Sequence, residues 1–354
     1  MFQIFNIRIL IGILIFDLPR YIGVLWASQG SLASLANRRE RLDAAPDNSG
    51  FRCDWQWTSD LHAPKVLPIL GRRLMTRALS AHPIRCLSQP KFVSEQPDVS
   101  FIIGHRGMAR LPHLLATLES IAGQQGASFE CLVVEQDTNS LLSERLPSWV
   151  SLIHTPPPTA DMPYCRAWTF NVGAKHARGK VFVLHDNDML IPHDYAAQIM
   201  LRLNQGYEVA NLKRFIFYLN EMHTRAVFAG NALLTDQAPE AIVQNLEAGG
   251  SVAIEREAYR RIGGMDESFI GWGGEDNEFW ERAQTCKVWP YGYLHLVHLW
   301  HPSQPGKYQV DNHALKRYRD LAAVPAIERI GKLTTDKSGD LAGPIGYAGG
   351  QARR

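Results

Sequence analysis

The chain has 354 residues, of which 45% are hydrophobic and 20% are charged. This composition is that of a globular protein long enough for one large domain or two smaller ones. The formal net charge is only +2, and no run resembles a recognition helix or an aromatic and basic strand platform, so we expect no nucleic-acid partner. The five cysteines are scattered and form no Cys-x-x-Cys pair, which favours reduced thiols in a cytoplasm over a disulfide framework.

Residues 1–97 carry no recognisable chemistry, and we expect them to form a helical N-terminal extension. Residues 9–16 are an uninterrupted apolar run that Asp17, Pro19 and Arg20 end at once. The run is too short for a spanning helix, which needs about 20 apolar residues, and the interruption fits poorly with a signal peptide.

A second apolar stretch at residues 21–27 precedes the basic sequence Arg38-Arg39-Glu40-Arg41. Two interpretations of this region stay open. Apolar segments beside arginines fit an anionic membrane surface, which would place a cytoplasmic protein at the inner face of the membrane. They fit equally a buried helix of a small N-terminal subdomain.

From residue 98 onward, strand-like and helix-like segments alternate. Apolar runs of strand type lie at residues 99–104, 130–136, 149–154, 181–185 and 251–254, and helical spacing at 112–124 and 166–177. This alternation predicts an α/β fold with a mainly parallel central sheet flanked by helices, in which ligands bind at the carboxyl ends of the strands. We expect this domain to span residues 98–302. Residues 303–354 then form a helix at about 313–323 and a small, polar, glycine-rich tail that is disordered from about residue 334.

The most informative stretch is Gly-Trp-Gly-Gly-Glu-Asp at residues 271–276. Its three glycines lack a Cβ atom and can let a ligand approach the backbone closely. They surround Trp272 and precede Glu275 and Asp276, which open a predicted helix over residues 276–283. Two interpretations are open: an aromatic wall with a candidate base, or a glycine turn followed by acids that favour a helix N-terminus.

Asp186-Asn187-Asp188 directly follows the apolar run at residues 181–185. Side chains two positions apart in an extended segment point the same way, so Asp186 and Asp188 could hold a hard divalent cation such as Mg²⁺ or Mn²⁺. The alternative is a simple turn, because Asp and Asn are good turn formers.

Three histidines, His295, His298 and His301, recur at every third residue. Each could supply a nitrogen ligand to the same ion, or be structural. No Cys/His spacing of the zinc-finger type surrounds them, so we expect no separate zinc site.

Arg106 and Arg110 follow the first predicted strand, and Arg166 opens a predicted helix. Guanidinium groups at strand ends suit phosphate oxygens, whereas solvation at the surface is the other interpretation and is favoured for Arg110. The second strand ends near Gln136, where a nucleotide base or ribose could be recognised.

The glycine-rich segments at residues 249–251, 263–266 and 271–276 read GGS, GGMD and GWGGED. In this order they resemble the C-terminal motif of the β-1,4-galactosyltransferases and of the bacterial family 2 glycosyltransferases that share it, including chondroitin-polymerase-like enzymes. The resemblance runs from about residue 99 to residue 301. It implies a GT-A fold, a nucleotide-sugar donor and a divalent metal ion, Mn²⁺ or Mg²⁺. The turn His105-Arg106-Gly107 departs from the family pattern, and residues 1–97 have no counterpart that we can place.

The resemblance also implies residue roles. Asp276 matches the catalytic base, and Glu275 orients the substrate. Asp188 and His301 match metal ligands, with His298 at the place of a second histidine ligand, and Asp186 matches the first acid of the DxD-type motif. Donor or substrate contacts are implied for Arg166 and Trp272, and we also expect them for Arg106, Gln136, Asp186 and Gly250.

These features together predict an inverting, metal-dependent glycosyltransferase. It would move a hexose or N-acetylhexosamine from a UDP-sugar to a glycan acceptor, in the synthesis of a surface polysaccharide or glycoconjugate. The chain also resembles the retaining polypeptide N-acetylgalactosaminyltransferases, but these carry Asn at the position of Asp276 and His at that of Asp188. A non-catalytic sugar- or nucleotide-binding module is a rival from another class, although none of the base or metal acids is missing.

Overall fold

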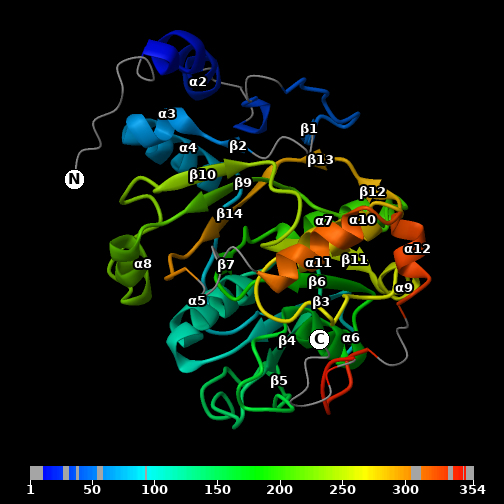
Figure 1. Cartoon of the computed structure of the whole chain (residues 1–354). Coiled ribbons are helices and arrows are strands. Elements are labelled where there is room, and N and C mark those ends of the chain that lie inside the picture. The colour runs from blue at the N-terminus through cyan, green and yellow to red at the C-terminus, as the bar shows by residue number, and fades with distance from the viewer. Residues whose placement is uncertain are drawn as a thin grey trace.

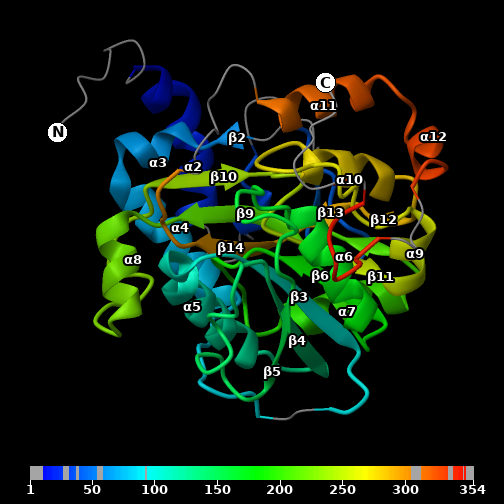
Figure 2. The same ribbon diagram turned by 60° about the horizontal axis from the view of Figure 1, so that its bottom comes forward.

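The computed structural model describes residues 11–26, 32–36, 40–53, 59–91, 94–303, 312–333, 338–345 and 347. A seven-stranded mixed sheet lies at its centre (Figures 1 and 2), in the order β12-β8-β11-β6-β3-β4-β5. Its strands are β3 (Val99–His105), β4 (Phe129–Glu135), β5 (Val150–His154), β6 (Val181–His185), β8 (Val209–Ala210), β11 (Ser251–Glu255) and β12 (Val288–Trp289). The strands β6, β3, β4 and β5 run parallel, and β11 pairs antiparallel with β6 and β8. The predicted α/β fold with a mainly parallel sheet is therefore confirmed.

The parallel strands form because their apolar runs can be buried on both faces. Phe101 and Ile103 of β3 pack in one core cluster with Leu114 and Leu118, whereas Ile102 between them packs on the opposite side with Phe170. Helix α5 (Leu111–Ala122) therefore covers one face and α6 (Arg166–His176) the other. The remaining helices of this domain are η3 (Met108–Arg110), α7 (Tyr195–Asn204), α8 (Glu221–Phe228), α9 (Arg256–Arg261) and α10 (Glu275–Ala283).

A second sheet of five strands packs on the α5 side, in the order β2-β10-β9-β14-β7. Its strands are β2 (Ser59–Asp60), β7 (Met189–Leu190), β9 (Lys213–Tyr218), β10 (Ala241–Gln244) and β14 (Leu294–His298). β14 runs parallel to β9 and antiparallel to β7. Because β7 directly follows Asp188 and β14 ends at His298, this sheet brings two distant parts of the sequence together.

The N-terminal segment is joined to the rest of the chain by strands as well as helices. Its helices are η1 (Ile13–Asp17), α2 (Leu18–Trp26), η2 (Leu32–Ser34), α3 (His62–Val66) and α4 (Pro68–Ala81). The strand β1 (Phe51–Arg52) pairs with β13 (Tyr291–Gly292), and β2 pairs with β10. A buried ion pair between Glu40 and Arg214, 2.5 Å apart, adds a third connection. Residues 1–10, Arg38 and Arg39, on which part of the membrane interpretation rests, lie outside the described residues.

The C-terminal segment contains α11 (His313–Ala322) and α12 (Ala326–Ile330). Beyond them, residues 338–345 pack against the domain, so the expectation of disorder from about residue 334 is wrong for this part. The buried carboxylate of Glu267 accepts hydrogen bonds from the backbone N–H groups of Gly339 and Ile345, and the indole of Trp168 donates to the carbonyl of Asp340 at 2.7 Å. These backbone contacts do not depend on the hydrophobicity of the tail, which is why composition did not indicate them.

Candidate active site

The stretch at residues 271–276 forms a loop that leads into α10. The helix begins at Glu275, one residue before the predicted start, and Gly274 precedes it with a left-handed φ of 86°. A Cβ atom on Gly273 would lie 2.9 Å from Leu315, and one on Gly274 would lie 2.6 Å from Tyr318. Helix α11, rather than a ligand, therefore packs against Gly273 and Gly274. This corrects the expectation that these glycines let a ligand approach the backbone. A Cβ atom added to Gly271, the first glycine of the loop, would have no other atom within 4 Å.

Asp276 lies over the glycine pair at the start of β11. A Cβ on Gly249 would lie 3.1 Å from an oxygen of the Asp276 carboxylate. The next residue, Gly250, donates its N–H to the Asp186 carboxylate at 2.9 Å and accepts a backbone hydrogen bond from Asp186 at 2.9 Å. These two hydrogen bonds fix the position of Asp186 near Asp276. A small pocket adjoins the Asp276 side chain and is lined also by Arg166, Gly249 and Trp280.

One arginine joins the acids of two chain segments. Arg166, the first residue of α6, forms ion pairs with Asp276 and with Asp186, the latter at 2.5 Å, and its guanidinium lies 3.7 Å from the Glu275 carboxylate. Burial raises the pKa of Glu275 to about 7, and the neighbouring charge of Asp276 adds to this effect. Burial also raises the pKa of Asp276, although Arg166 acts in the opposite direction.

Lys213 places a second cation near these acids. Its side chain is buried, and its ammonium group donates to the Asn211 side chain at 2.9 Å and to the Ser251 carbonyl at 3.3 Å. Burial lowers its pKa to about 7, while Asp276 and Asp186 favour the charged form. Sequence reasoning did not find this residue, because a lysine at the start of a strand carries no distinguishing local signal.

Asp188, His298 and His301 form a candidate metal centre. One donor atom from each lies within 4.8 Å of the others. The Nε2 atom of His301 is 3.4 Å from the Asp188 carboxylate, and that of His298 is 3.9 Å away. The other ring nitrogen of His298 is buried without a hydrogen-bond partner among the described residues. One carboxylate and two imidazoles in common reach fit a divalent transition ion such as Mn²⁺.

The remaining predicted metal candidates lie elsewhere. His295 is buried in the core against Phe217, because residues three apart on a strand face opposite sides. Asp186 turns to Arg166 rather than to the histidines. Conversely, Arg110 forms an ion pair with Asp188, although the sequence favoured a solvated position for it. The pairing depends on the turn after β6, which sequence spacing does not indicate.

The predicted nucleotide contacts lie at the carboxyl ends of β3 and β4. Arg106 donates to the Met162 carbonyl at 2.7 Å and lies 4.0 Å from Asp137, which also accepts the Gly107 N–H at 2.7 Å. Gln136 is fully buried, and its side-chain oxygen accepts the Cys165 N–H at 2.9 Å. The structure therefore places Gln136 beneath the start of α6, and the partly exposed carboxylate of Asp137 is the better candidate for a ribose contact.

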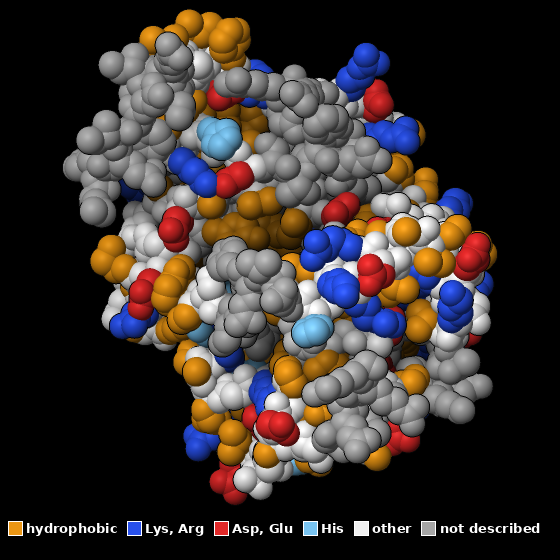
Figure 3. All heavy atoms as spheres, in the orientation of Figure 1, with side chains coloured by type: hydrophobic (Ala, Val, Ile, Leu, Met, Phe, Trp, Pro, Cys, Tyr) orange, Lys and Arg blue, Asp and Glu red, His pale blue; other side chains and the backbone are white. Residues whose placement is uncertain are grey.

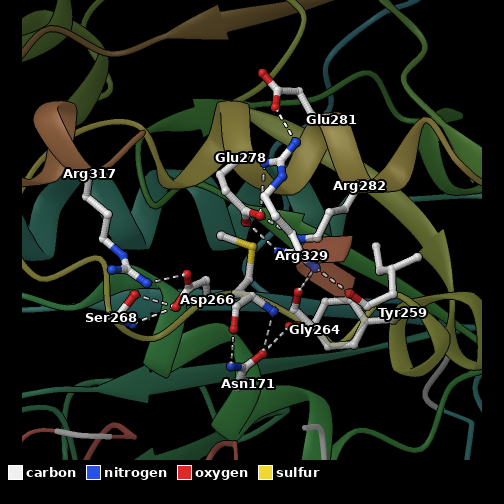
Figure 4. A network of polar contacts seen from close by, with 12 residues as sticks. Asn171, Tyr259, Gly264, Asp266, Ser268, Glu278, Glu281, Arg282, Arg317 and Arg329 are labelled. Carbon is white, nitrogen blue, oxygen red and sulfur yellow. Dashed lines mark hydrogen bonds and ion pairs between the residues drawn. The ribbon is translucent and has the colours of Figure 1, made fainter. Parts of the chain in front are cut away.

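A buried network holds α10 in place (Figure 4). Arg282 pairs with Glu278 one turn earlier and donates to the carbonyls of Ile262 and Gly264. Arg329 of α12 pairs with Glu278 at 3.2 Å and with Glu281 at 2.5 Å. A second group around Asn171 of α6 binds both backbone groups of Met265. The helix that carries Asp276 is thus anchored to the glycine segment at 263–266 and to the C-terminal helices.

Trp272 is 37% exposed, and its backbone carbonyl accepts a hydrogen bond at 3.0 Å from Asn312, the residue that caps α11. The loop that bears the Trp272 ring is therefore fixed by a hydrogen bond from the residue that caps α11. A partly exposed aromatic face of this kind can stack against a sugar ring.

Comparison with known proteins identifies one segment of the chain. Residues 244–297 match the family model described as the N-terminal domain of galactosyltransferase. Over 176 residues the chain is 26% identical to β-1,4-galactosyltransferase 5 of Sus scrofa, a match that covers 50% of this chain and 34% of that protein. The chain therefore spans about a third of the length of this relative.

Two solved structures are similar at 16% sequence identity. The catalytic domain of Drosophila β1,4-galactosyltransferase 7, in complex with xylobiose, has a TM-score of 0.36 and covers 63% of this chain and 80% of its own. GalNAc-T7, with UDP, GalNAc and Mn²⁺, has a TM-score of 0.46 and covers 66% and 49%. The sequence match is the more specific finding: the chain carries a galactosyltransferase-type segment at residues 244–297, and this segment holds Gly250, Trp272, Glu275 and Asp276.

Proposed function

We propose that the protein is an inverting, metal-dependent glycosyltransferase that moves a hexose or N-acetylhexosamine from a UDP-sugar to a glycan acceptor. The observation that carries the proposal is the contact of Arg166 with both Asp276 and Asp186. This contact sets a candidate base beside the turn that bears Asp188, the carboxylate of the candidate metal centre. The galactosyltransferase-type segment supports the same chemistry.

Asp276 is the proposed general base. Its half-buried carboxylate has a raised pKa because it is partly removed from water, and a base works best when its pKa lies near the working pH. The acceptor hydroxyl oxygen attacks the anomeric carbon of the donor while Asp276 takes the hydroxyl proton. The bond from the anomeric carbon to the diphosphate oxygen breaks, and UDP leaves with the bonding electrons. The transition state resembles an oxocarbenium ion, as in glycoside hydrolysis.

The other residues bind and orient the substrates. The guanidinium of Arg166 offers charge-assisted hydrogen bonds to the diphosphate oxygens, and Trp272 offers a ring face to the sugar. Asp188, His298 and His301 would hold the divalent ion, which neutralises charge on a phosphate leaving group. Glu275 would orient the acceptor through its buried carboxyl group.

Direct displacement by the acceptor inverts the configuration at the anomeric carbon. A retaining reaction is the alternative, and the carboxylate at position 276 favours inversion because it can accept the acceptor proton. The NMR coupling of the anomeric proton in the product separates the two outcomes. We place the activity in glycoconjugate or surface polysaccharide synthesis, and in the cytoplasm, a compartment in which five free cysteines are expected.

The proposal is tested with a panel of nucleotide sugars in the presence of Mn²⁺, with nucleotide release as the readout. Release should occur with at least one UDP-sugar and should be lost in Asp188→Ala. A matched control is Asp236→Ala, which removes an exposed acid from the loop after α8. Release that is equally fast in Asp188→Ala and in the control would remove the metal centre from the proposal. If no nucleotide sugar in the panel releases its nucleotide, or if only sugars of nucleotides other than UDP do, the proposal of a UDP-sugar donor is wrong.

A further inference from the structure

The helical segment of residues 11–26 is apolar on both of its faces. Its inner side chains Ile13, Tyr21 and Val24 are buried in a core cluster with Leu70 and Leu74 of α4. Five large apolar side chains of this segment are between 47% and 61% exposed, namely Ile11, Leu14, Ile15, Phe16 and Ile22. Hydrophobic side chains gather at the same place in the space-filling view (Figure 3), at the end of the molecule where α2 lies. A contiguous apolar patch on one helix indicates a binding surface more strongly than scattered exposed residues do.

Positive charge is concentrated in the same part of the chain. Residues 1–97 contain 12 Lys and Arg against 7 Asp and Glu, a net charge of +5, whereas residues 98–354 contain 25 against 28, a net charge of −3. The first two acids of the sequence, Asp17 and Glu40, are both buried and paired with arginines, Arg20 and Arg214. They therefore contribute little negative potential at this end of the molecule.

Two arginines of α4 lie on the face that adjoins the apolar helix, whereas Arg72 donates to the carbonyl of Thr235 at 2.8 Å. The sequence of α4, PILGRRLMTRALSA, contains Arg72, Arg73 and Arg77 and no acid. The guanidinium of Arg77 donates to the carbonyl of Val24 in α2, and Arg73 lies one turn earlier on the same face of α4. An exposed apolar strip is thus accompanied by arginines on the adjoining helix.

We propose that the outer face of residues 11–26 binds the surface of an anionic lipid bilayer, with Arg73 and Arg77 of α4 at the headgroups. Apolar side chains beside cationic ones are the arrangement of helices that lie in the bilayer interface. Sixteen residues of helix reach only about 24 Å, and among the described residues no helix has the length and hydropathy that spanning requires. A second copy of the chain fits less well, because a two-fold contact at this face would set the basic patches of both copies against each other.

Vesicle co-sedimentation tests this proposal. The protein should bind vesicles of equimolar phosphatidylcholine and phosphatidylglycerol, bind phosphatidylcholine vesicles much more weakly, and dissociate as salt is raised, because anionic headgroups attract it. The double variant Ile15→Ser/Ile22→Ser should lose about tenfold or more in affinity, since it removes apolar area from the interface. Arg73→Gln should weaken binding to the anionic vesicles by about fivefold while leaving any residual binding to phosphatidylcholine unchanged.

The matched control is Met222→Ser/Leu233→Ser, which removes two apolar side chains that are 68% and 71% exposed and lie outside residues 11–26. This control should bind the anionic vesicles as the natural protein does. Equal sedimentation with both kinds of vesicle, no sedimentation with either, or full binding by Ile15→Ser/Ile22→Ser with an unchanged melting temperature would overturn the proposal. Light scattering measures the oligomeric state independently. If the natural protein is a dimer and Ile15→Ser/Ile22→Ser is a monomer, the face binds a second copy of the chain and not a membrane. The test does not depend on transferase activity, so it stands whether or not the proposed reaction is found.

Discussion

The guanidinium of Arg166 forms an ion pair with the carboxylate of Asp276, 110 positions later in the sequence. The two residues belong to the first turns of α6 and α10, so two helix N-termini meet at this contact. The partial positive charge of helix N-termini attracts anions and adds to that of the arginine. A diphosphate that enters the site would compete with Asp276 for Arg166, and this exchange would release the carboxylate to act as a base.

We expect Arg166→Met to lower kcat/KM by about 10²- to 10³-fold, the usual effect of removing a positioned charge from a transition-state site. The variant also leaves Asp276 and Asp186 without their shared partner, so UDP affinity measured by calorimetry should fall. Arg166→Lys should recover only part of the loss, because an ammonium group cannot donate two parallel hydrogen bonds as a guanidinium can. Full activity in the lysine variant would show that charge alone is required.

The raised pKa values of Glu275 and Asp276 predict the pH dependence of the reaction. The base Asp276 must be ionised and burial raises its pKa, so kcat/KM should start to fall at a higher pH than the value of about 4 at which an unperturbed carboxylate titrates. Glu275→Gln removes one of two interacting charges and should move the inflection to lower pH. An inflection that stays in place would assign the titration to another group.

The same shift has a consequence for stability with a defined sign. The folded protein retains a proton on Glu275 at pH values where the unfolded chain has lost it, so stability should fall as pH rises from about 4.5 to about 7. Denaturant unfolding checks this contribution: stability should fall less steeply between about pH 4.5 and pH 7 in Glu275→Gln than in the natural protein.

Gly271 and Gly273 both have left-handed φ angles, 91° and 107°, but only a Cβ on Gly273 would meet Leu315. Each alanine substitution should cost about 1–2 kcal/mol in backbone strain. Gly273→Ala should lower the free energy of unfolding by about 1–3 kcal/mol more than Gly271→Ala does, because the added methyl group would displace Leu315 and with it α11. Denaturant unfolding of the two variants checks the difference. Equal destabilisation would mean that α11 does not depend on this glycine for its packing.

Glu40→Ala should destabilise the protein by about 3–5 kcal/mol, since it leaves Arg214 buried without its ion-pair partner. Glu221→Ala, which breaks the exposed pair with Arg225, should change the stability by less than about 1 kcal/mol. Similar values for the two variants in denaturant unfolding would show that the N-terminal segment is not held to β9 by the Glu40 contact.

The central domain could be predicted because its signals are local. The predicted strand at residues 181–185 agrees with β6, and the helix predicted at 276–283 starts one residue earlier in the structure. Both elements are specified by their own apolar pattern and by the residues that flank them. The galactosyltransferase-type segment likewise carries its glycines and acids within 30 residues, from Gly249 to Asp276.

The features that escaped prediction depend on distant partners. β1 and β2 are two residues long and form only because β13 and β10 present free edges. The position of Arg110 at Asp188 depends on the turn after β6, and the burial of Gln136 depends on the start of α6. Glycines 273 and 274 suggested ligand access, yet their open sides are filled by α11, about 40 residues later. Local pattern does not determine contacts of this kind.

The most direct test of the account replaces Asp276 by Asn and measures turnover and UDP binding on the same protein. The amide has nearly the same shape as the carboxylate and cannot accept the acceptor proton as a base. We predict that sugar transfer collapses while UDP still binds in a manner that requires the divalent ion. Transfer that continues at the natural rate in Asp276→Asn would contradict the assignment of Asp276 as the base.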